Sequence, residues 1–374
     1  MEKKLSSSNC RRAAFSLGAK TFWRIPGAFG IARVLGRDYS LRCVVFHHIS
    51  AKDSPFTHGI NVRTSPEEFE MALAFIAANY TPVRLDDILD AGRKLPSRPM
   101  LITFDDAYAS VADIAAPLCK KYRIPAVFFV NAALLDNQML AADNLVCYAV
   151  RMHGMAALNA AAREAVRPAT MELSSLAQVF NVFFPALTLD ERRAFIDALK
   201  SALRINERQL AQEASLYLSS EQLGALRDFD FEIGNHTYSH VHCRRLSSAD
   251  YAEEIDRNKA ALEAISCTNV RAFSQPYGSS SDLTPNLVGH LRSTGHKAAF
   301  LSESVANTNL GQFVFDRINP CAKNEGTLFF EVEVLPRLRS LRNRHLWNRQ
   351  KSMVHKTVGP GDETCKVEEQ RLAL

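Results

Sequence analysis

The sequence lacks cysteine pairs at the spacings of a disulfide framework or of a CxxC motif. Its eight cysteines are scattered through 374 residues, at positions 10, 43, 119, 147, 243, 267, 321 and 365. Scattered thiols of this kind are typical of reduced cysteines in a cytosol. They argue against a small secreted domain built on disulfides.

The sequence also has no apolar run long enough to span a membrane. Near the N-terminus the apolar stretches are interrupted by Lys20, Arg24 and Arg33, so no clean signal-peptide core forms. No internal repeat or low-complexity segment is evident. A cytoplasmic protein is therefore the simplest expectation, and peripheral association with a membrane is left open.

The excess of one charge is small, since 45 basic and 40 acidic residues give a formal net charge of +5. Seven Lys or Arg residues and no acid fall between Arg337 and Lys356. We therefore delimit a basic N-terminal extension (residues 1–40) and a basic C-terminal tail (336–374). Such ends can bind anionic membranes or nucleic acid, but a solvated end is the simpler interpretation and no nucleic-acid partner is expected.

The residues between these ends have an ordinary globular composition, with 47% hydrophobic and 23% charged residues in the whole chain. From residue 41 to 335, short β-rich runs alternate with helical patterns, which favours a parallel α/β fold. Seven or eight strands suggest a distorted (β/α) barrel rather than an open sheet. The strands are predicted in the runs RCVVFHHIS, PVRL, MLITF, AVFFV, FEIG, RAFSQPYG, KAAFLS and FVFDRI.

Residues 131–220 interrupt this alternation, because they contain helical patterns and no convincing strand. We interpret them as a helical insertion in the barrel. The insertion either caps a substrate groove or merely pads the barrel. Its aromatic run, Phe180 to Phe184, is more typical of a core than of a sugar-binding platform.

Polar motifs follow several of the predicted strands: His47-His48, Asp105-Asp106, His236 with His240, and the SQPYG turn. In parallel α/β folds, chemistry collects at the carboxyl ends of the strands. The common placement of these motifs therefore predicts one active site.

Asp105 and Asp106 stand directly behind a run of apolar β-formers. Neighbouring side chains at a strand end point in different directions, so one carboxylate can bind a metal while the other acts as a base. The alternative is that they cap the helix that begins near Tyr108. A cap needs only one of them.

His236 and His240 are four residues apart immediately after a predicted strand. On one helical turn, residues at this spacing project from the same face, so both imidazoles can reach a single cation. Two imidazoles and one carboxylate would leave open positions for water and substrate, as in catalytic zinc sites. His242 and Cys243 fall outside that face and are interpreted as supporting or structural residues.

Three motifs together resemble the successive motifs of the polysaccharide deacetylase family, the NodB-homology domain. They are TFDDA (Thr103 to Ala107), HTYSH (His236 to His240) and SQPYG (Ser274 to Gly278), in the order that the family has them. The resemblance implies a deacetylase barrel over residues 41–335 and metal-dependent removal of acetyl groups from an N-acetylated polysaccharide or oligosaccharide. The divalent metal of the family is usually zinc.

The resemblance also assigns roles. It implies that Asp105 is the general base and that Asp106, His236 and His240 are the metal ligands. It implies further that the backbone N–H of Tyr277 stabilises the oxyanion.

The family's general acid is a histidine, usually from a late motif that this chain lacks. The front strand VVFHHIS resembles that of branches with a permuted barrel order, so His47 is the expected acid. His48 points the opposite way along the strand and is expected to be a core or supporting residue.

Two departures from the family pattern matter. Ala107 stands where glycine is common, so we expect a backbone without a positive φ there. Ser274 stands where an arginine often orients the base, and Arg317 is a candidate substitute. Two alternatives stay open: a chitooligosaccharide deacetylase of nodulation-signal synthesis, and a non-catalytic carbohydrate-binding barrel, which the missing arginine would favour.

Overall fold

The structure is a computed structural model of the chain, and it describes residues 40–90, 92–166, 172–227, 231–307 and 312–342. Nearly all of the predicted basic N-terminal extension and most of the basic tail lie outside these ranges. The interpretation of both ends, and with it the cytoplasmic location, stays a prediction. No helix within the described ranges is both long and apolar enough to cross a membrane.

A parallel sheet forms the centre of the molecule, in the order β1-β5-β6-β7-β8-β9-β10, with β4 paired to β5. The residues after β10 close it, because Ile318 bridges to β1: its N–H donates to the carbonyl of Cys43 and its own carbonyl accepts from Val45. The predicted α/β barrel of seven to eight strands is therefore confirmed. The strands are β1 (Arg42–Phe46), β4 (Thr81–Pro82), β5 (Pro99–Phe104), β6 (Ala126–Val130), β7 (Glu232–Asn235), β8 (Ala272–Ser274), β9 (Ala298–Leu301) and β10 (Val314–Asp316). A separate pair, β2 (His48–Ile49) and β3 (Arg63–Thr64), follows β1.

The strands are continuously apolar because both of their faces are buried. Every residue of β5 and of β6 is buried. One face packs inside the barrel, where Phe129, Phe300 and Phe315 belong to one cluster. The other face packs under the surrounding helices, as Phe104 and Phe128 do. Alternation along each strand therefore divides the core into an inner and an outer layer.

The helices around the barrel are α3 (Pro66–Asn79), α4 (Leu85–Leu89), α5 (Ala116–Tyr122), α12 (Ser220–Leu226), α13 (Ser248–Tyr251), α14 (Arg257–Ser266), α15 (Pro285–Ser293), α16 (Glu325–Phe329) and α17 (Leu335–Arg342). Local sequence fixes where several of them begin. At α3, Ser65 accepts from the N–H of Glu68, whose carboxylate accepts from the N–H of Ser65, and Pro66 occupies the first turn.

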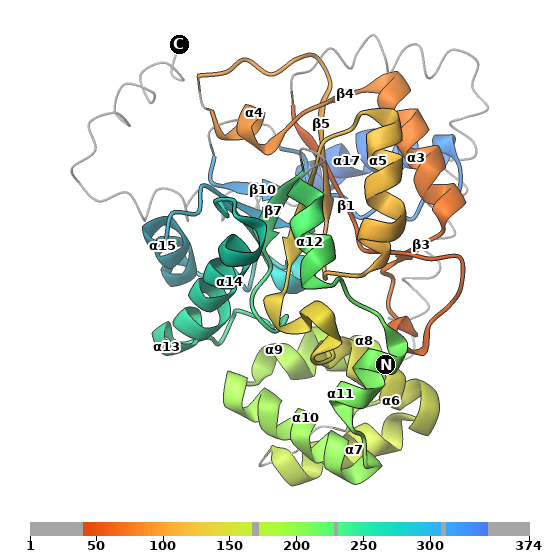
Figure 1. The fold of residues 1–374 in the computed structure, drawn as a ribbon, viewed down its shortest axis with the longest axis vertical. Helices are drawn as coiled ribbons and strands as arrows, with labels where there is room; N and C mark the ends of the chain where they lie inside the picture. Colours follow the sequence, from red (N-terminus) through yellow and green to blue (C-terminus); the bar gives the residue numbers. More distant parts are fainter. Residues whose placement is uncertain (1–39, 91, 167–171, 228–230, 308–311, 343–374) are drawn as a thin grey trace.

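Between β6 and β7 the described residues form helices and no strand. After the 3-10 turn η3 (Ala132–Asn137) come α6 (Ala142–His153), α7 (Met155–Ala165), α8 (Leu176–Gln178), α9 (Phe184–Ala186), α10 (Leu189–Leu203) and α11 (Glu207–Ala214). We call the described residues from α6 to α11 (142–166 and 172–214) the helical lobe; these helices gather at one end of the barrel in Figure 1. The lobe has a core of its own, which includes Phe183, Phe184, Phe195 and Leu199.

Candidate active site

One cavity, of about 370 Å³, lies where the strand ends and the helical lobe meet. Its lining includes polar residues that follow four strands: β1, β5, β7 and β8. The residues that follow these strands are His47, Asp105, Asp106, His236, His240 and Tyr277, and the lobe adds Asp143 and Phe180 to the lining. All six residues that the sequence proposed for the site therefore lie around one cavity.

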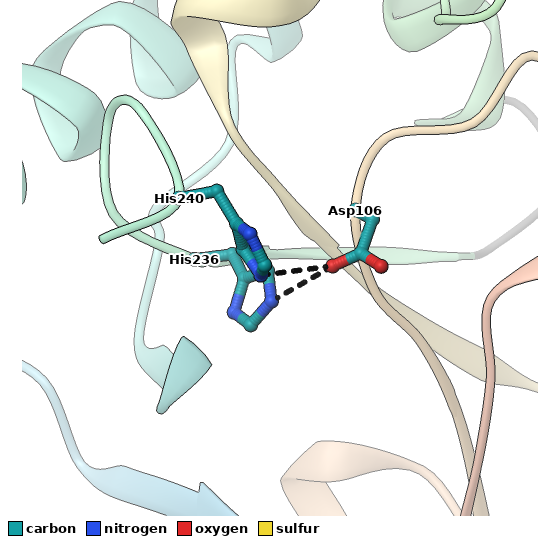
Figure 2. A group of neighbouring side chains, drawn as sticks. All are labelled: Asp106, His236 and His240. Atoms are coloured by element: carbon teal, nitrogen blue, oxygen red, sulfur yellow. Dashed lines mark hydrogen bonds and ion pairs between the residues drawn. The ribbon is translucent and has the colours of Figure 1, made fainter. Parts of the chain in front are cut away.

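Asp106, His236 and His240 form a compact group of possible metal ligands. Their ligand atoms all lie within 4.8 Å of one another, and all three side chains are buried. The Nε2 atoms of His236 and His240 lie 3.2 and 3.3 Å from the same oxygen, Asp106 Oδ1. Figure 2 shows both rings directed at that carboxylate.

The expectation that a helical turn brings the two histidines together is wrong. Residues 236–240 form a loop after β7, in which Thr237 (φ +62°) and His240 (φ +57°) have left-handed backbone. The side-chain amide of Asn131 donates to the carbonyls of His236 and Thr237. Buried Glu254 accepts from the N–H of Ser239 at 2.9 Å. The loop, rather than helical periodicity, therefore sets the spacing of the two rings.

The chemistry of this donor set fits a divalent metal. His236 Nδ1 lies 2.8 Å from the carbonyl oxygen of Ser274, so Nδ1 donates and Nε2 keeps the lone pair that a metal needs. Burial pushes the pKa of Asp106 upward, but the imidazoles of His240 and His236 hold that pKa below its usual range, so the carboxylate stays ionised. Two imidazoles and one carboxylate leave positions open for water and substrate.

Asp105 is held separately from this group, by Arg317. Arg317 Nη1 and Nη2 donate to the two carboxylate oxygens of Asp105, each at 2.7 Å, and both residues are buried. The hydroxyl of Ser274 donates to Asp105 at 3.1 Å and accepts from Arg317 at 2.7 Å. Burial raises the pKa of Asp105, but Arg317, His236 and His47 together hold that pKa below its usual range. The candidate substitute for the arginine absent at Ser274, Arg317, therefore does contact Asp105, as a residue that orients this carboxylate must.

The turn after β5 contradicts the expectation for Ala107. Asp106 (φ +72°) and Ala107 (φ +55°) both have left-handed backbone, although neither is glycine. The carbonyl of Ala107 accepts from the N–H of Leu218 at 2.8 Å, which ties the turn to the segment before α12. Tertiary hydrogen bonding thus imposes a conformation that alanine adopts at a cost of about 1–2 kcal/mol.

His47 and His48 face different surroundings, as the alternation of side chains along a strand predicts. His47 lines the cavity, and its Nδ1 has no hydrogen-bond partner among the described residues. Burial lowers the pKa of His47, while Asp106 and Asp105 raise it by smaller amounts. His48 lies outside the cavity lining, where its Nδ1 is 3.2 Å from the hydroxyl of Ser110 and its ring contacts Tyr108.

Tyr277 closes another side of the cavity. It has left-handed backbone (φ +60°) in the turn Pro276–Gly278. The ring of His242 stacks on the Tyr277 ring with centroids 3.8 Å apart, and His242 Nδ1 lies 2.7 Å from buried Asp282. His242 therefore supports Tyr277 from behind and faces away from the cavity. Cys243 is buried in a neighbouring core cluster.

Sequence reasoning missed Asp143 and Arg192, which the lobe brings to the site. It assigned Phe180 to a core, and Phe180 does belong to the lobe core, but it also lines the cavity. Asp143 and Phe180 line the cavity, and Arg192 donates to the carbonyl of His240 and to the hydroxyl of Tyr277. One signal was available for Asp143, since an acid stands within the apolar run LAADNLV. A charge on an apolar helix face calls for a buried partner. Arg192 lies in a charged stretch, LDERRAF, that carries no such signal.

Comparison with known proteins agrees with this geometry. The family model described as polysaccharide deacetylase matches residues 92–299. Among solved structures, a Streptococcus pyogenes deacetylase, PplD, in complex with acetate is 14% identical (TM-score 0.51; 79% of this chain and 98% of that chain covered). IcaB from Ammonifex degensii is 18% identical (TM-score 0.50; 80% and 99% covered). At these identities the likeness shows the fold alone. No curated protein matches the chain.

Proposed function

Since the chain belongs to the polysaccharide deacetylase family, and is thus a carbohydrate deacetylase, we propose that it hydrolyses the acetamide groups of an N-acetylated polysaccharide with the help of a divalent metal, zinc being the expected ion. The observation that carries the proposal is that two adjacent carboxylates lie in different environments, one suited to a metal ligand and the other to a base. Asp106 faces two imidazole nitrogens, and Asp105 is held by Arg317.

Asp106, His236 and His240 would hold the metal. When bound, such an ion lowers the pKa of a water molecule and polarises the acetamide carbonyl. Asp105 takes the proton of the attacking water at a carboxylate oxygen, and Arg317 fixes the direction of that carboxylate. The buried, ionised state of Asp105 suits this role because the base must be free of a proton before attack.

Tyr277 would stabilise the negative oxygen of the intermediate, and His47 would protonate the leaving nitrogen. Tyr277 lies in the turn Pro276–Gly278 and lines the cavity, and its N–H would donate to the oxygen that becomes negative. Because burial lowers the pKa of His47, its ring has to take up a proton after substrate binds; as the carbon–nitrogen bond breaks, His47 then gives that proton to the leaving nitrogen. Acetate and a free amine result. Asp105 has gained one proton and His47 has lost one, so exchange of one proton by each residue with solvent restores the starting state.

A second hollow supports a polymer as the substrate. It has a volume of about 900 Å³ and shares Gly59, Ile60 and Asn61 with the site cavity. Its lining is largely polar and includes Thr57, His58 and Arg151. The cavity would take the acetylated sugar, and the hollow would take the sugars beside it.

The metal and the base can be tested together. We expect the purified protein to hold a divalent ion, to lose it in His236→Ala, and to keep it in Asp105→Asn. The Asp105→Asn rate of acetate release from N-acetylglucosamine oligomers should fall by at least about a hundredfold. Metal analysis that finds no ion in the wild type would remove the assigned site. An undiminished rate in Asp105→Asn would remove Asp105 as the base.

Substrate length separates the polymer from a short chitooligosaccharide. We expect Arg151→Ala to raise KM for long oligomers and to leave the value for the dimer unchanged, while Arg163→Ala, on the exposed face of α7, changes neither. Equal KM values for short and long oligomers in the wild type would instead favour the nodulation-signal type of substrate.

A further inference from the structure

His236 and His240 are held in different ways behind the atoms that face Asp106. The barrel holds His236, because its Nδ1 donates to the carbonyl of Ser274 in β8. The lobe lies behind His240. The Nδ1 of His240 is 3.5 Å from Asp143 Oδ2, and the carbonyl of His240 accepts from Arg192 Nη2 at 2.9 Å.

Asp143 is a buried carboxylate with an incomplete set of partners. It lies in the first turn of α6 with 7% of its surface exposed, and within the described part of the chain its Oδ1 has no hydrogen-bond partner. In the same part of the chain, His240 Nδ1 has no hydrogen-bond partner either. The other oxygen of the same carboxylate, Asp143 Oδ2, is the one that lies 3.5 Å from His240 Nδ1. Because each of these buried side chains has an unsatisfied atom, a small adjustment of the carboxylate is expected to complete the contact when the site is loaded.

Metal binding would complete this contact through the tautomer of the ring. If Nε2 of His240 gives its lone pair to a metal, then Nδ1 carries the proton and becomes a donor toward Asp143. Metal-bound histidines commonly donate their second ring nitrogen to a carboxylate in this way. The carboxylate and the metal thus favour the same tautomer and ring orientation.

The neighbour of Asp143 keeps this carboxylate in place. The side-chain amide of Asn144 donates to the carbonyl of Phe56 at 2.9 Å and to the hydroxyl of Tyr108 at 3.0 Å. The hydroxyl of Tyr217 donates to the amide oxygen of Asn144 and accepts from the N–H of Ala141. The first turn of α6 is therefore fixed against the barrel, and Asp143 with it.

Arg192 acts on the backbone of the same histidine. It is 5% exposed in α10, and its Nη2 donates to the carbonyl of His240 and, at 3.0 Å, to the hydroxyl of Tyr277. Its guanidinium lies over the Phe184 ring, 4.6 Å from the ring centroid. Because the left-handed backbone of His240 is unfavourable for an L residue, an anchored carbonyl helps to keep it.

We propose that Asp143 and Arg192 are positioning residues that hold the ring and the backbone of His240 in the metal-facing orientation, so that the helical lobe completes the metal site. This inference rests on the proposed metal-dependent function. It goes beyond it by giving the lobe a part in metal binding that the three ligands alone do not require.

Asp143→Ala tests the ring contact by metal affinity, measured in competition with a coloured chelator and zinc. We expect an affinity loss of about 10- to 100-fold. The thermal midpoint of the metal-free variant should change little, because the contact with His240 is long, at 3.5 Å, and the other carboxylate oxygen has no hydrogen-bond partner among the described residues. Asp143→Asn keeps an acceptor oxygen and should recover part of the affinity. Asp190→Ala, at an acid of the lobe whose side chain is 95% exposed, is the matched control and should change nothing.

Arg192→Lys tests the backbone contact without removing the charge. An ammonium cannot reproduce the guanidinium's two fixed donors, so we expect a changed visible spectrum of the cobalt-loaded protein and a lower metal affinity. Arg193→Lys, whose arginine is 45% exposed and pairs with Glu253, should keep both properties.

The outcomes distinguish this inference from the proposed function. Wild-type metal affinity in Asp143→Ala, with an unaltered cobalt spectrum in Arg192→Lys, would overturn the positioning roles while the wild type still binds metal and releases acetate. A wild type that binds no metal would overturn both. A purely structural role would lower the thermal midpoint and leave the metal affinity and the spectrum of the folded fraction unchanged, which also contradicts the proposal.

Discussion

The barrel and the helical lobe contribute to the site in different ways. The barrel places ionisable groups directly at the carboxyl ends of its strands, as with Asp105 after β5 and His236 after β7. The lobe places Asp143 and Arg192 against His240, a residue that the barrel has already positioned in part. Backbone topology thus brings the reacting groups together, and side chains of the lobe then fix the orientation of one of them, His240.

The two regions also have separate cores. Phe129 and Phe300 pack within the barrel, whereas Phe183, Phe184 and Phe195 pack together in the lobe. The lobe reaches the site through a few buried polar contacts and through Phe180, which lines the cavity and stacks on Tyr277. Damage to the barrel core or the strand ends should therefore abolish chemistry, and damage to the lobe should weaken the site without removing its reacting groups.

Arg317→Met, in the barrel, should have the largest effect. It leaves the buried carboxylate of Asp105 without its bidentate partner, and removal of one member of a buried ion pair costs about 3–5 kcal/mol of the free energy of unfolding. The rate of acetate release should also fall at least about a hundredfold, because the base loses its orientation. Urea denaturation and acetate release measure the two effects.

The effect of Arg317→Met on stability should depend on pH. In the folded protein the pKa of Asp105 lies below its ordinary value, so the pairing stabilises the fold above pH about 4 and this contribution is lost as pH falls through the folded pKa. The variant and the wild type should therefore converge in acid. The double variant Arg317→Met/Asp105→Asn should be more stable than Arg317→Met at neutral pH. If the double variant were the less stable one, the paired charge would not explain the loss.

Phe195→Ala, in the lobe core, should destabilise by about 3–5 kcal/mol as well but should spare the chemistry. At saturating metal, kcat of the folded variant should stay within about tenfold of the wild type. The metal affinity should fall, because Arg192 stands on the same helix as Phe195, and Asp143 stands on α6, which contributes to the same core. Phe195→Leu, which removes less volume, is the control. Loss of kcat in folded, metal-loaded Phe195→Ala would show that the lobe does more than hold His240.

The same contrast explains what the sequence could predict. The strand ends were predictable because parallel strands bring their carboxyl ends to one edge whatever the loops between them do. Thus Asp105, Asp106 and His236 fell into one cavity as expected, and Arg317 could be named as a candidate before its contact was known. The contribution of Asp143 depends on how a separate group of helices packs, which short-range patterns do not encode.

The local backbone conformation of the two loops at the site could not be predicted from the sequence either. A spacing of four residues suits a helical turn and a tight loop equally. The loop at His236 to His240 is selected by long-range hydrogen bonds, in which Asn131 donates to the loop and Glu254 accepts from it. Similarly, alanine at position 107 favours ordinary φ, but the bond from Leu218 selects a positive one. In both cases contacts distant in sequence override a local preference.

Ala107→Gly, at the barrel turn, should have the smallest effect. Relief of left-handed strain, about 1–2 kcal/mol, is opposed by the loss of a buried methyl group, about 0.8 kcal/mol, and by the extra freedom of glycine in the unfolded chain, about 0.5–1 kcal/mol. The free energy of unfolding should therefore change by less than about 1 kcal/mol, with no change in acetate release. Ala107→Val should destabilise more, since a β-branched residue tolerates positive φ poorly. A gain of several kcal/mol in Ala107→Gly together with a slower reaction would mean that the strained turn, and not only the two histidines, directs Asp106 toward the metal.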